Sequence, residues 1–587
     1  MASYYVENFG CRATQADGAA LERQFEERGL ARASTSAQAD FVVLNSCTVT
    51  AAADHDARAA IRRVRRLNPT AKIVVTGCYA QRAPAEIAAL PGVACVVGNS
   101  HKHQLAEIAV RCRPDADAHA REGYDLSGSE LASGAKAGGD LKFRGASSTA
   151  GNDLEFRSAS GTLTNDFGGR SDSRLAKSAA LIERALAPVG SAFIPVTALT
   201  ARDPGPIFVS DIFAHTELMA APVFDAANER TRPNLKVQDG CDNRCSFCVI
   251  PYVRGQSRSL PMDEIVREVN TLVEAGYREV VISGINLGRW GIDLSARRRL
   301  LVLCKADDLG LQTSGLRLQT SDLGNRLAAE VRWPRSDAAS PRFEDLIRAI
   351  LSETSLEKLR ISSVEPMDWS DELITLVAES PRIAKHAHVP LQSGSDAVLR
   401  RMHRKYRPWH YREKIEKIRV AMPTAAIGAD VMAGFPGETD SEFEATRRVI
   451  EDLPFTYLHV FTYSARPGTP AANMRDQVPV RVARERNRIL RDLAAEKKQA
   501  FMRSFIGQTV EAITLSSTYP LTSRAQSADS LANQSGDEPI VPSETTFTEA
   551  LTDNYLKLRL AGRHQPNRWL RVRVENIQAE ALAGSAH

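Results

Sequence analysis

The sequence predicts an α/β protein with three folded parts: a small parallel α/β domain at the N-terminus, a central partial (β/α)6 barrel, and a small antiparallel β-barrel at the C-terminus. Three observations predict it. Apolar β-branched runs alternate with helical patterns up to residue 112, the alternation returns from residue 231, and a period-two pattern dominates from residue 507. A chain of 587 residues is also too long for one hydrophobic core.

The N-terminal domain, residues 1–112, contains three βα units. Their strands are SYYVENFG (3–10), ADFVVLNS (39–46) and AKIVVTG (71–77). Because strand–helix–strand crossovers set neighbouring strands parallel, these units predict a small parallel sheet covered by helices.

One helix of this domain, residues 52–69, is strongly basic. Its arginines either face a phosphate backbone or form an ordinary solvated face, and the sequence leaves both interpretations open. They are Arg58, Arg62, Arg63, Arg65 and Arg66.

The central barrel, residues 231–475, contains six strand patterns separated by helical ones. In chain order the strands are LKVQD, EVVISGIN, KLRISSVEP, HAHVPLQSG, IGADVMAGFP and YLHVFTYS. Six successive βα units predict a curved parallel sheet or partial barrel with its functional site at the carboxyl ends of the strands.

Three segments interrupt or join these parts. Residues 113–230 are rich in Gly, Ser, Ala and Asp and read as a low-complexity linker or insertion. Residues of about 293–340 and 517–546 read as insertions in the central barrel and in the C-terminal β-barrel, which covers residues 507–580. A connecting helix is predicted over 476–506.

Composition places the chain among ordinary globular proteins, with 43% hydrophobic and 25% charged residues. The net charge of +4 is too small to indicate nucleic-acid binding, which has to be argued from local patches. The N-terminal residues show no secretory pattern and no run of eighteen apolar residues occurs, so a cytoplasmic protein is expected. In that compartment nine cysteines are better explained as ligands or catalysts than as disulfides.

The first set of candidate ligands, the N-terminal trio, is Cys11, Cys47 and Cys78. Each follows one predicted strand, and the carboxyl ends of adjacent parallel strands converge on one crevice. The pattern favours a three-thiol site, and the competing interpretation is three buried, inert cysteines. The remaining cysteines lack this placement and read as packing or surface thiols: Cys95, Cys112 and Cys304.

A second set, the loop trio, is Cys241, Cys245 and Cys248, with the pattern C-x3-C-x2-C after the first barrel strand. A structural zinc site would require a fourth ligand nearby, and no Cys or His lies within thirty residues on the carboxyl side. A [4Fe–4S] cluster held by three thiolates leaves one iron open for an exchangeable ligand. The spacing therefore favours the cluster over zinc.

The loop trio at the start of a partial barrel resembles the radical S-adenosylmethionine (SAM) enzymes. The resemblance implies that SAM binds the open iron and is cleaved to a 5′-deoxyadenosyl radical. SGINLG (283–288) is similar to the family's turn beside the methionine moiety, and AGFPGE (433–438) to its turn near the adenosine. The SAM-contacting candidates, including one residue at the end of the fourth strand, are Gly284, Asn286, Gln392, Gly434, Gly437 and Glu438.

Taken together, the two trios and the C-terminal β-barrel resemble the methylthiotransferases, whose last module is the RNA-binding TRAM domain. The resemblance implies that the N-terminal trio holds a second [4Fe–4S] cluster that handles sulfur. It also implies a tRNA partner and an electron donor such as flavodoxin or ferredoxin. One departure is present: around Cys11 the family has Gly-Cys-Lys-x-Asn-Gln, whereas this chain has Arg12 and Thr14 and keeps Gln15.

Within this family, VQDGCDNRCSFCVIPYVRG, LRISSVEP and HVPLQSGSDAVLRRMHRKY look most like the branch that modifies N6-threonylcarbamoyladenosine in tRNA at position 37. Two other substrates remain open, isopentenyladenosine in tRNA and a ribosomal-protein aspartate. From another class, a non-catalytic RNA-binding protein with structural metal sites is the alternative. No residue is assigned to the hydrogen transfer itself.

Several other residues have two interpretations. Asp239 is either a substrate or SAM contact or a turn residue. Glu365 lies at the end of the third strand, where side chains point into the barrel mouth, and has either a polar role in the site or a purely structural one. His388 and His459 read as packed histidines. In the C-terminal tail, cations lie beside aromatic rings. They either bind phosphates and stack on unpaired RNA bases or form a half-exposed face of the β-barrel. These residues are Tyr555, Lys557, Arg559, Arg568, Trp569, Arg571 and Arg573.

Overall fold

The computed structural model describes residues 2–112, 206–214, 218, 231–294, 340–520, 546–578 and 580–586. These residues belong to one compact unit, formed by Met1–Cys112 and Leu199–His587. Most of the predicted linker, of the insertion near 293–340 and of the insertion near 517–546 lies outside the described residues.

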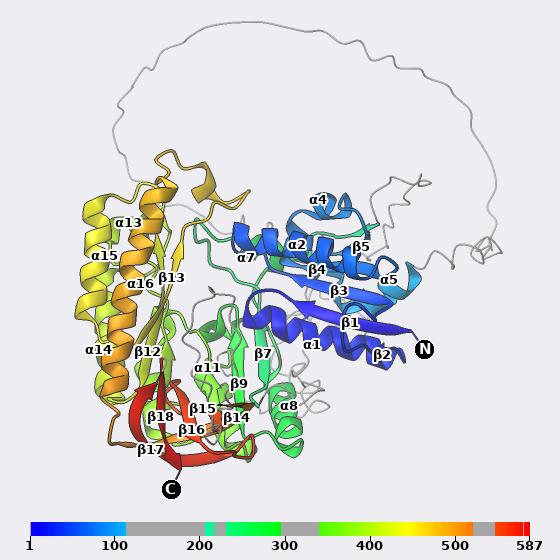
Figure 1. Cartoon of the computed structure of the whole chain (residues 1–587). Coiled ribbons are helices and arrows are strands. Elements are labelled where there is room, and N and C mark those ends of the chain that lie inside the picture. The colour runs from blue at the N-terminus through cyan, green and yellow to red at the C-terminus, as the bar shows by residue number, and fades with distance from the viewer. Residues whose placement is uncertain are drawn as a thin grey trace, which may run out of the picture. The chain divides into compact units, whose positions relative to one another are not determined.

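The N-terminal domain is a parallel sheet in the order β2-β1-β3-β4-β5-β6 (Figure 1). Its strands are β1 (Ser3–Asn8), β2 (Ala31–Arg32), β3 (Phe41–Ser46), β4 (Lys72–Gly77), β5 (Val93–Val97) and β6 (Ile207–Phe208). The predicted strands β1, β3 and β4 are confirmed and are direct neighbours in the sheet. Their carboxyl ends therefore meet at one edge.

Helices cover both faces of this sheet. Residues such as Ile61, Tyr79 and Ile87, from α2 (Ala51–Leu67), α3 (Cys78–Arg82) and α4 (Pro84–Ala88), form the core on one face. Residues such as Leu21 and Leu105, from α1 (Arg12–Glu27) and α5 (Leu105–Arg111), form the core on the other. Between β5 and α5 lies the 3-10 helix η1 (Asn99–Gln104).

The edge strand β6 was not expected, because Ile207–Phe208 falls within the predicted linker. It pairs in parallel with β5, through Val96 and Val97. Two residues are too few to give a period-two pattern, so the composition of residues 113–230 predicted a linker and not a strand.

The central barrel contains the six predicted parallel strands. They are β7 (Asn234–Asp239), β9 (Glu279–Gly284), β10 (Lys358–Ile361), β11 (His386–His388), β12 (Ala426–Ala433) and β13 (Tyr457–Thr462). Isolated parallel bridges, Leu359 to Ile383 and Ser363 to His388, join β10 to β11 and so connect the two groups of strands. The prediction of a partial (β/α)6 barrel is confirmed; β8 (Arg258–Ser259) adds a short antiparallel edge beside β7.

Amphipathic helices pack on the outside of these strands and bury one continuous core. They are α8 (Met262–Glu274), α11 (Phe343–Glu353), α12 (Asp371–Glu379), α13 (Asp396–Arg401), α14 (Pro408–Ala421) and α15 (Asp440–Asp452). A capping box between Thr439 and Glu442 begins α15. The long α16 (Val480–Arg503) runs beside β13 and leads into the C-terminal barrel (Figure 1).

The C-terminal part is a closed barrel in the order β14-β15-β16-β18-β17. Its strands are β14 (Thr509–Pro520), β15 (Thr546–Thr552), β16 (Lys557–Ala561), β17 (Trp569–Gln578) and β18 (Ala581–Ala586). The pairings are antiparallel except that of β16 with β18. Because β14 continues to Pro520, the predicted insertion at 517 begins too early.

The C-terminal barrel docks against the amino ends of the central strands. Arg360 of β10 donates hydrogen bonds to the carbonyl oxygens of Thr552 and Asp553, at 3.3 and 3.0 Å. Asn554 donates to the carbonyl oxygen of Thr424, two residues before β12, at 2.9 Å. The carboxyl ends of the central strands, where the loop trio lies, are at the opposite end.

Among the helices of the described ranges, none combines the length and the apolar character that crossing a bilayer requires.

Candidate functional site

The N-terminal trio converges at the carboxyl edge of the first sheet. Cys11 lies three residues after the end of β1, and Cys47 and Cys78 directly follow β3 and β4. Burial, with smaller contributions from the neighbouring Cys78 and Cys11, raises the pKa of the Cys47 thiol to about 12. A Cβ atom at Gly10 would lie 2.5 Å from Cβ of Cys47, so glycine is needed for this close approach. The three thiols therefore share one site.

The loop trio lies between β7 and α7 (Ile250–Arg254). Burial raises the pKa of Cys248 to about 12, and the thiols of Cys245 and Cys241 add to the rise. Burial also raises the pKa of Cys241 to about 11, although the backbone N–H of Asn243 donates to its sulfur at 3.4 Å. These thiols resist ionisation unless a cationic group binds them.

The two trios are joined by α7. Cys78 packs against Val249 and Val253, which follow Cys248 along the chain. Asn99 fixes this contact, because its Nδ2 lies 3.7 Å from Sγ of Cys78 and 2.7 Å from the carbonyl oxygen of Val253. The two sites therefore face the same interface between the N-terminal domain and the central barrel.

The donor sets fit iron–sulfur clusters. Each trio presents three soft thiols at a loop beside small residues, the ligand type that [4Fe–4S] clusters use. Within the described ranges, no group of three His, Cys, Asp or Glu side chains is placed to hold a single metal ion. Burial and mutual repulsion oppose the free thiolates, and a bound cluster would remove both penalties.

The turn after β9 also fits a polar ligand. Ser283 Oγ and Asn286 Oδ1 are buried, and neither has a hydrogen-bond partner among the described residues. Gln238, a residue that the sequence analysis missed, accepts a hydrogen bond from the Asn286 N–H at 2.7 Å and donates to the carbonyl oxygen of Gly240 at 2.8 Å. It thereby ties this turn to the start of the cysteine loop. Gly284 is close-packed against the same Gln238 side chain.

The turn after β12 is held by α16. A Cβ atom at Gly434 would lie 2.4 Å from Cβ of Ala483. Glu438 accepts hydrogen bonds from the Gly434 N–H at 2.8 Å and from Arg486 at 2.7 Å, while burial raises its pKa. The close contact with Ala483 explains why residue 434 is a glycine, and the two hydrogen bonds satisfy Oε2 of Glu438. Oε1 of Glu438 is buried without a hydrogen-bond partner in the described part of the chain. Gly437 donates its N–H to the carbonyl oxygen of Asp476.

Gln392, the other SAM-contacting candidate, lies beyond β11 with a left-handed backbone, φ 61°. Its N–H donates to the carbonyl oxygen of Asp430, and its own carbonyl accepts from Met432. The backbone is thus fixed to β12 at the carboxyl end of the strands, which positions the side chain near the barrel mouth.

Arg404 connects the loop trio to Glu365, and the sequence analysis missed this residue. Its Nη1 donates to Sγ of Cys245 at 3.3 Å, its Nε to the Tyr406 hydroxyl at 3.2 Å, and its Nη2 to Glu365. Tyr406 in turn shares its hydroxyl proton between the carbonyl oxygens of Pro390 and Leu391, just beyond β11. The polar role predicted for Glu365 is therefore to hold this arginine.

The two histidines predicted to be packed belong to one aromatic group on β11 and β13. His388 is buried, hydrogen-bonds the Tyr457 hydroxyl at 2.9 Å and lies 3.2 Å from Asp430. The ring centroid of His459 lies 5.5 Å from that of His388, but His459 is exposed, so the prediction of a packed histidine is confirmed for His388 and wrong for His459. Their contacts are with other side chains of the barrel wall.

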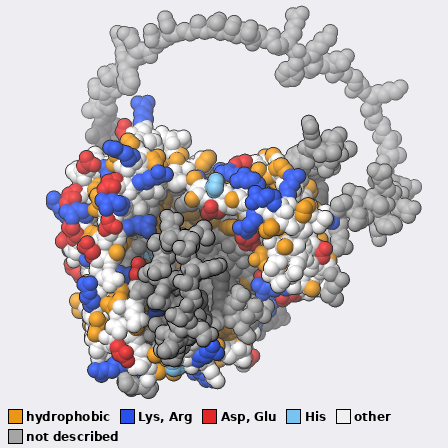
Figure 2. Space-filling model, viewed as in Figure 1, with side chains coloured by type: hydrophobic (Ala, Val, Ile, Leu, Met, Phe, Trp, Pro, Cys, Tyr) orange, Lys and Arg blue, Asp and Glu red, His pale blue; other side chains and the backbone are white. Residues whose placement is uncertain are grey.

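Cations on two surfaces remain candidates for RNA contact. On α2, Arg58 pairs with Glu86 and Arg63 with Glu7, whereas Arg62, Arg65 and Arg66 are exposed. Figure 2 shows Lys and Arg side chains gathered over the α2 region of the molecule. Among the described residues of the C-terminal barrel, exposed cations include Lys557, Arg563, Arg568, Arg571 and Arg573.

The two aromatic rings predicted to stack on RNA bases pack inward instead. Tyr555 lies against His386, with ring centroids 4.6 Å apart, and Trp569 lies under the Lys358 ammonium at 5.0 Å. The sequence pattern could not reveal this, because both partners come from the central barrel.

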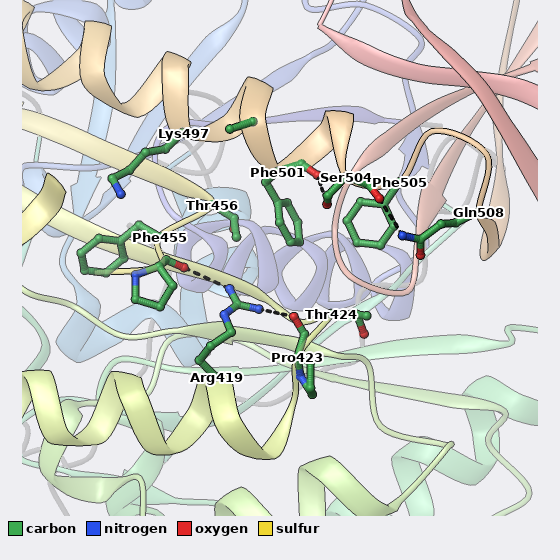
Figure 3. Close-up of a pocket in the computed structure, with 12 residues that line it drawn as sticks. Arg419, Pro423, Thr424, Phe455, Thr456, Lys497, Phe501, Ser504, Phe505 and Gln508 are labelled. Carbon is green, nitrogen blue, oxygen red and sulfur yellow. Dashed lines mark hydrogen bonds between the residues drawn. The ribbon is translucent and has the colours of Figure 1, made fainter. Parts of the chain in front are cut away.

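A cavity of about 500 Å³ lies between α14, α16 and the start of β14 (Figure 3). Arg419 on its wall donates to the carbonyl oxygens of Pro423 at 2.7 Å and Pro454 at 3.0 Å. Lys497 donates to the carbonyl oxygen of Leu453 at 2.9 Å. Since both cations bind backbone carbonyls, they stabilise the junction beneath the barrel rather than a ligand.

Two family models match the chain. Residues 3–98 match the model described as uncharacterized protein family UPF0004, and residues 235–332 and 335–450 match the radical SAM superfamily. The first range contains the N-terminal trio and the second contains the loop trio.

Curated relatives cover most of the chain. The threonylcarbamoyladenosine tRNA methylthiotransferase MtaB of Bacillus subtilis is 30% identical over 87% of this chain and 85% of its own length. The protein of the same name from Aquifex aeolicus is 29% identical over 88% and 93%. A tRNA-2-methylthio-N(6)-dimethylallyladenosine synthase of Coxiella burnetii is 34% identical over 53% of this chain and 63% of its own length. The two cysteine trios, together with 30% identity over 87% of the chain, show that the chain belongs to the MtaB family of radical SAM methylthiotransferases.

Proposed function

We propose that this enzyme is a tRNA methylthiotransferase that converts N6-threonylcarbamoyladenosine, at position 37 next to the anticodon, to its 2-methylthio derivative. The observation that carries the proposal is the joining of two three-thiol sites through α7, where Cys78 packs on the helix that follows Cys248. Removal of a hydrogen from an aromatic carbon and insertion of sulfur require two reactive centres close together.

The cofactors are SAM and two [4Fe–4S] clusters. We assign the loop trio to the radical-generating cluster and the N-terminal trio to the sulfur-handling cluster. When bound, these groups supply a radical that abstracts a hydrogen which no side-chain base could remove, and they supply the sulfur. The chain supplies thiolates, a hydrogen bond from Arg404 to Cys245, and the buried polar atoms of Ser283 and Asn286 in the turn after β9, where we expect SAM to bind.

Each folded part has one task in this proposal. Residues 1–112 carry the sulfur-handling cluster, residues 231–475 generate the radical, and residues 507–580, joined through the helix of 476–506, bind RNA. Exposed arginines such as Arg571 and Arg573 would contact tRNA phosphates. An electron donor such as flavodoxin or ferredoxin would reduce the loop cluster, and the reaction would take place in the cytoplasm.

The choice of substrate is supported by the extent of similarity. The MtaB relatives are similar over 85% and 93% of their own lengths, whereas the dimethylallyladenosine synthase from Coxiella is similar over 63%. Isopentenyladenosine in tRNA is therefore the second candidate, because that relative reaches 34% identity over the shared part. A ribosomal-protein aspartate is the third.

Nucleoside mass analysis of tRNA from a strain lacking this protein tests the proposal. We expect 2-methylthio-threonylcarbamoyladenosine to disappear while threonylcarbamoyladenosine accumulates. Complementation with the wild-type chain should restore the product, and complementation with Cys241→Ala should not. Unchanged product would exclude this substrate, and loss of the isopentenyl derivative would favour the second candidate. Colourless, zinc-containing protein that does not cleave SAM after reduction would exclude the enzyme class.

A further inference from the structure

A buried network of charges lies between the two cysteine trios, and we call it the bridging network. Its members come from α1, η1, β7 and α7, and every one of them is at most 6% exposed. They are Asp17, Lys102, Lys236, Asp239 and Arg254.

Arg254 links the two carboxylates of this network. Its Nη1 donates to both oxygens of Asp239 at 2.9 Å, and its Nη2 donates to Asp17 at 3.0 Å. Lys236 bridges the same carboxylates, with its Nζ 3.0 Å from Asp239 and in a short contact with Asp17. Lys102 donates to Asp17 at 3.0 Å. Each carboxylate is therefore held by at least two cations.

The positions of these residues along the chain connect the bridging network to both cysteine trios. Asp17 lies on the helix that begins directly after Cys11, and Asp239 lies two residues before Cys241. Arg254 ends the helix that follows Cys248, and Lys102 belongs to η1, whose Asn99 contacts Cys78. Segments that carry cysteines of both trios are thus tied to one charged centre.

The charge balance favours an electrostatic effect on the N-terminal trio. Three cations face two carboxylates, so the network carries a net positive charge in a buried region, and Arg258 lies beside it. Arg254 Nε is buried without a hydrogen-bond partner among the residues that the structure describes. Arg254 directly follows Val253, which packs against Cys78, and its guanidinium is held by Asp17 on the helix that begins after Cys11, so this cation lies close to the trio.

We propose that the bridging network is a positioning device that fixes the two iron–sulfur sites relative to each other, and that Arg254 is the positioning residue that holds a positive charge beside the N-terminal trio. The inference rests on the proposed function, because it concerns the two clusters assigned there. A fixed separation keeps the radical site and the sulfur site aligned on one substrate atom. A buried positive charge stabilises the reduced, more negative state of the neighbouring cluster.

The test uses the full-length protein with both clusters reconstituted anaerobically. The variant Asp17→Asn removes one buried negative charge with little change in shape. The matched control is Glu279→Gln, because Glu279 is also fully buried and held by two guanidiniums, Arg360 and Arg232, but begins β9 at the opposite end of the strands. Both variants lose a buried ion pair, so both should lower thermal stability.

Two measurements separate positioning from a merely structural role. Redox titration followed by electron paramagnetic resonance gives the midpoint potential of each cluster, and the line broadening of the doubly reduced protein reports the distance between the clusters. We expect Asp17→Asn to move the potential of the N-terminal cluster to a more positive value and to change the broadening. Glu279→Gln should leave both at wild-type values. Equal effects of the two variants, or no effect of Asp17→Asn, would overturn the proposal.

A second pair of variants decides the question if Asp17→Asn does not fold. Arg254→Gln removes the positive charge and should move the potential to a more negative value, whereas Arg254→Lys keeps the charge and should restore it. Identical potentials for the Gln and Lys variants would refute the role of Arg254. Wild-type protein that binds only one cluster would instead refute the proposed function, so the two failures are distinguishable.

Discussion

Arg404 Nη1 lies 3.3 Å from Sγ of Cys245, and the two residues are 159 positions apart in the chain. A guanidinium that donates to a ligand sulfur stabilises the reduced form of an iron–sulfur cluster, because it offsets negative charge on the sulfur. Glu365 and Tyr406 hold the guanidinium in this orientation.

Arg404→Gln should lower the midpoint potential of the loop cluster and slow reductive cleavage of SAM by about 10- to 100-fold, the usual effect of losing a residue that supports a cluster ligand. Arg404→Lys should recover part of the loss because it keeps the charge. Redox titration and 5′-deoxyadenosine formation measure the two effects. Arg407→Gln is the control, since Arg407 belongs to the same loop but pairs with Asp396. A wild-type potential in Arg404→Gln would contradict the prediction.

The cysteine assignment predicts iron content. Reconstituted wild-type protein should bind roughly eight irons per chain, and Cys47→Ala or Cys245→Ala should each bind roughly four. Only Cys245→Ala should lose reductive cleavage of SAM, because the other trio does not bind it. Cys95→Ala, which removes a fully buried thiol outside both trios, should keep all the iron. Iron analysis showing about four irons in the wild-type protein would disprove the assignment of the N-terminal trio.

The exposed arginines predict a salt-dependent affinity for tRNA. The double variant Arg571→Gln/Arg573→Gln should weaken binding, and the slope of log affinity against log salt should become shallower by about 0.7–0.9 for each phosphate that the protein no longer neutralises. Arg62→Gln/Arg65→Gln on α2 tests the second surface in the same way. Arg481→Gln/Arg484→Gln, exposed at the start of α16, is the charge-matched control. If all three double variants give one slope, specific binding of tRNA by either surface is ruled out.

Asp368 predicts a pH dependence of stability. Burial raises its pKa from 3.8 to about 6, with Glu365 adding to the rise and Arg289 opposing it. Because the pKa is higher in the folded than in the unfolded state, the stability contributed by protonation is fully present below about pH 4 and is lost as the pH rises through 6. Asp368→Asn should therefore raise the free energy of unfolding of the apo-protein at pH 8, by about 1–3 kcal/mol.

This advantage should shrink as the pH falls from 8 to 5, since wild-type Asp368 then becomes protonated. Thermal unfolding at several pH values measures it. Asp371→Asn is a suitable control, because Asp371 is solvent-exposed and its hydrogen bond with Lys417 lowers its pKa. A constant difference between Asp368→Asn and wild type across this range would refute the prediction.

The sequence was sufficient for the architecture because the strands are marked by composition. Val42, Val74 and Val281 lie in apolar β-branched runs that helices separate, and this pattern specifies parallel βα units. The short edge strand β6 carries too few residues to give such a signal. The period-two pattern around Tyr555 and Trp569 predicts rings exposed on the barrel surface, whereas both rings pack against residues of the central barrel.

The thiols of the candidate site could be predicted, because cysteine spacing and position after strands are visible in one dimension. The charges around them could not. Asp17 and Arg254 pair across 237 positions, and neither lies in a pattern that indicates burial. A buried ion pair is specified by tertiary packing, so hydrophobic periodicity does not reveal it.

The pairing of β6 with β5 has a consequence for biosynthesis. The first sheet lacks its last strand until Phe208 has been translated, so its edge at β5 stays open while the intervening segment emerges from the ribosome. The helix α7 and the bridging residues Lys236, Asp239 and Arg254 come later still. Nascent chains should therefore have to complete the first sheet and the cysteine loop, up to Arg254, before iron and sulfide can be loaded at both centres.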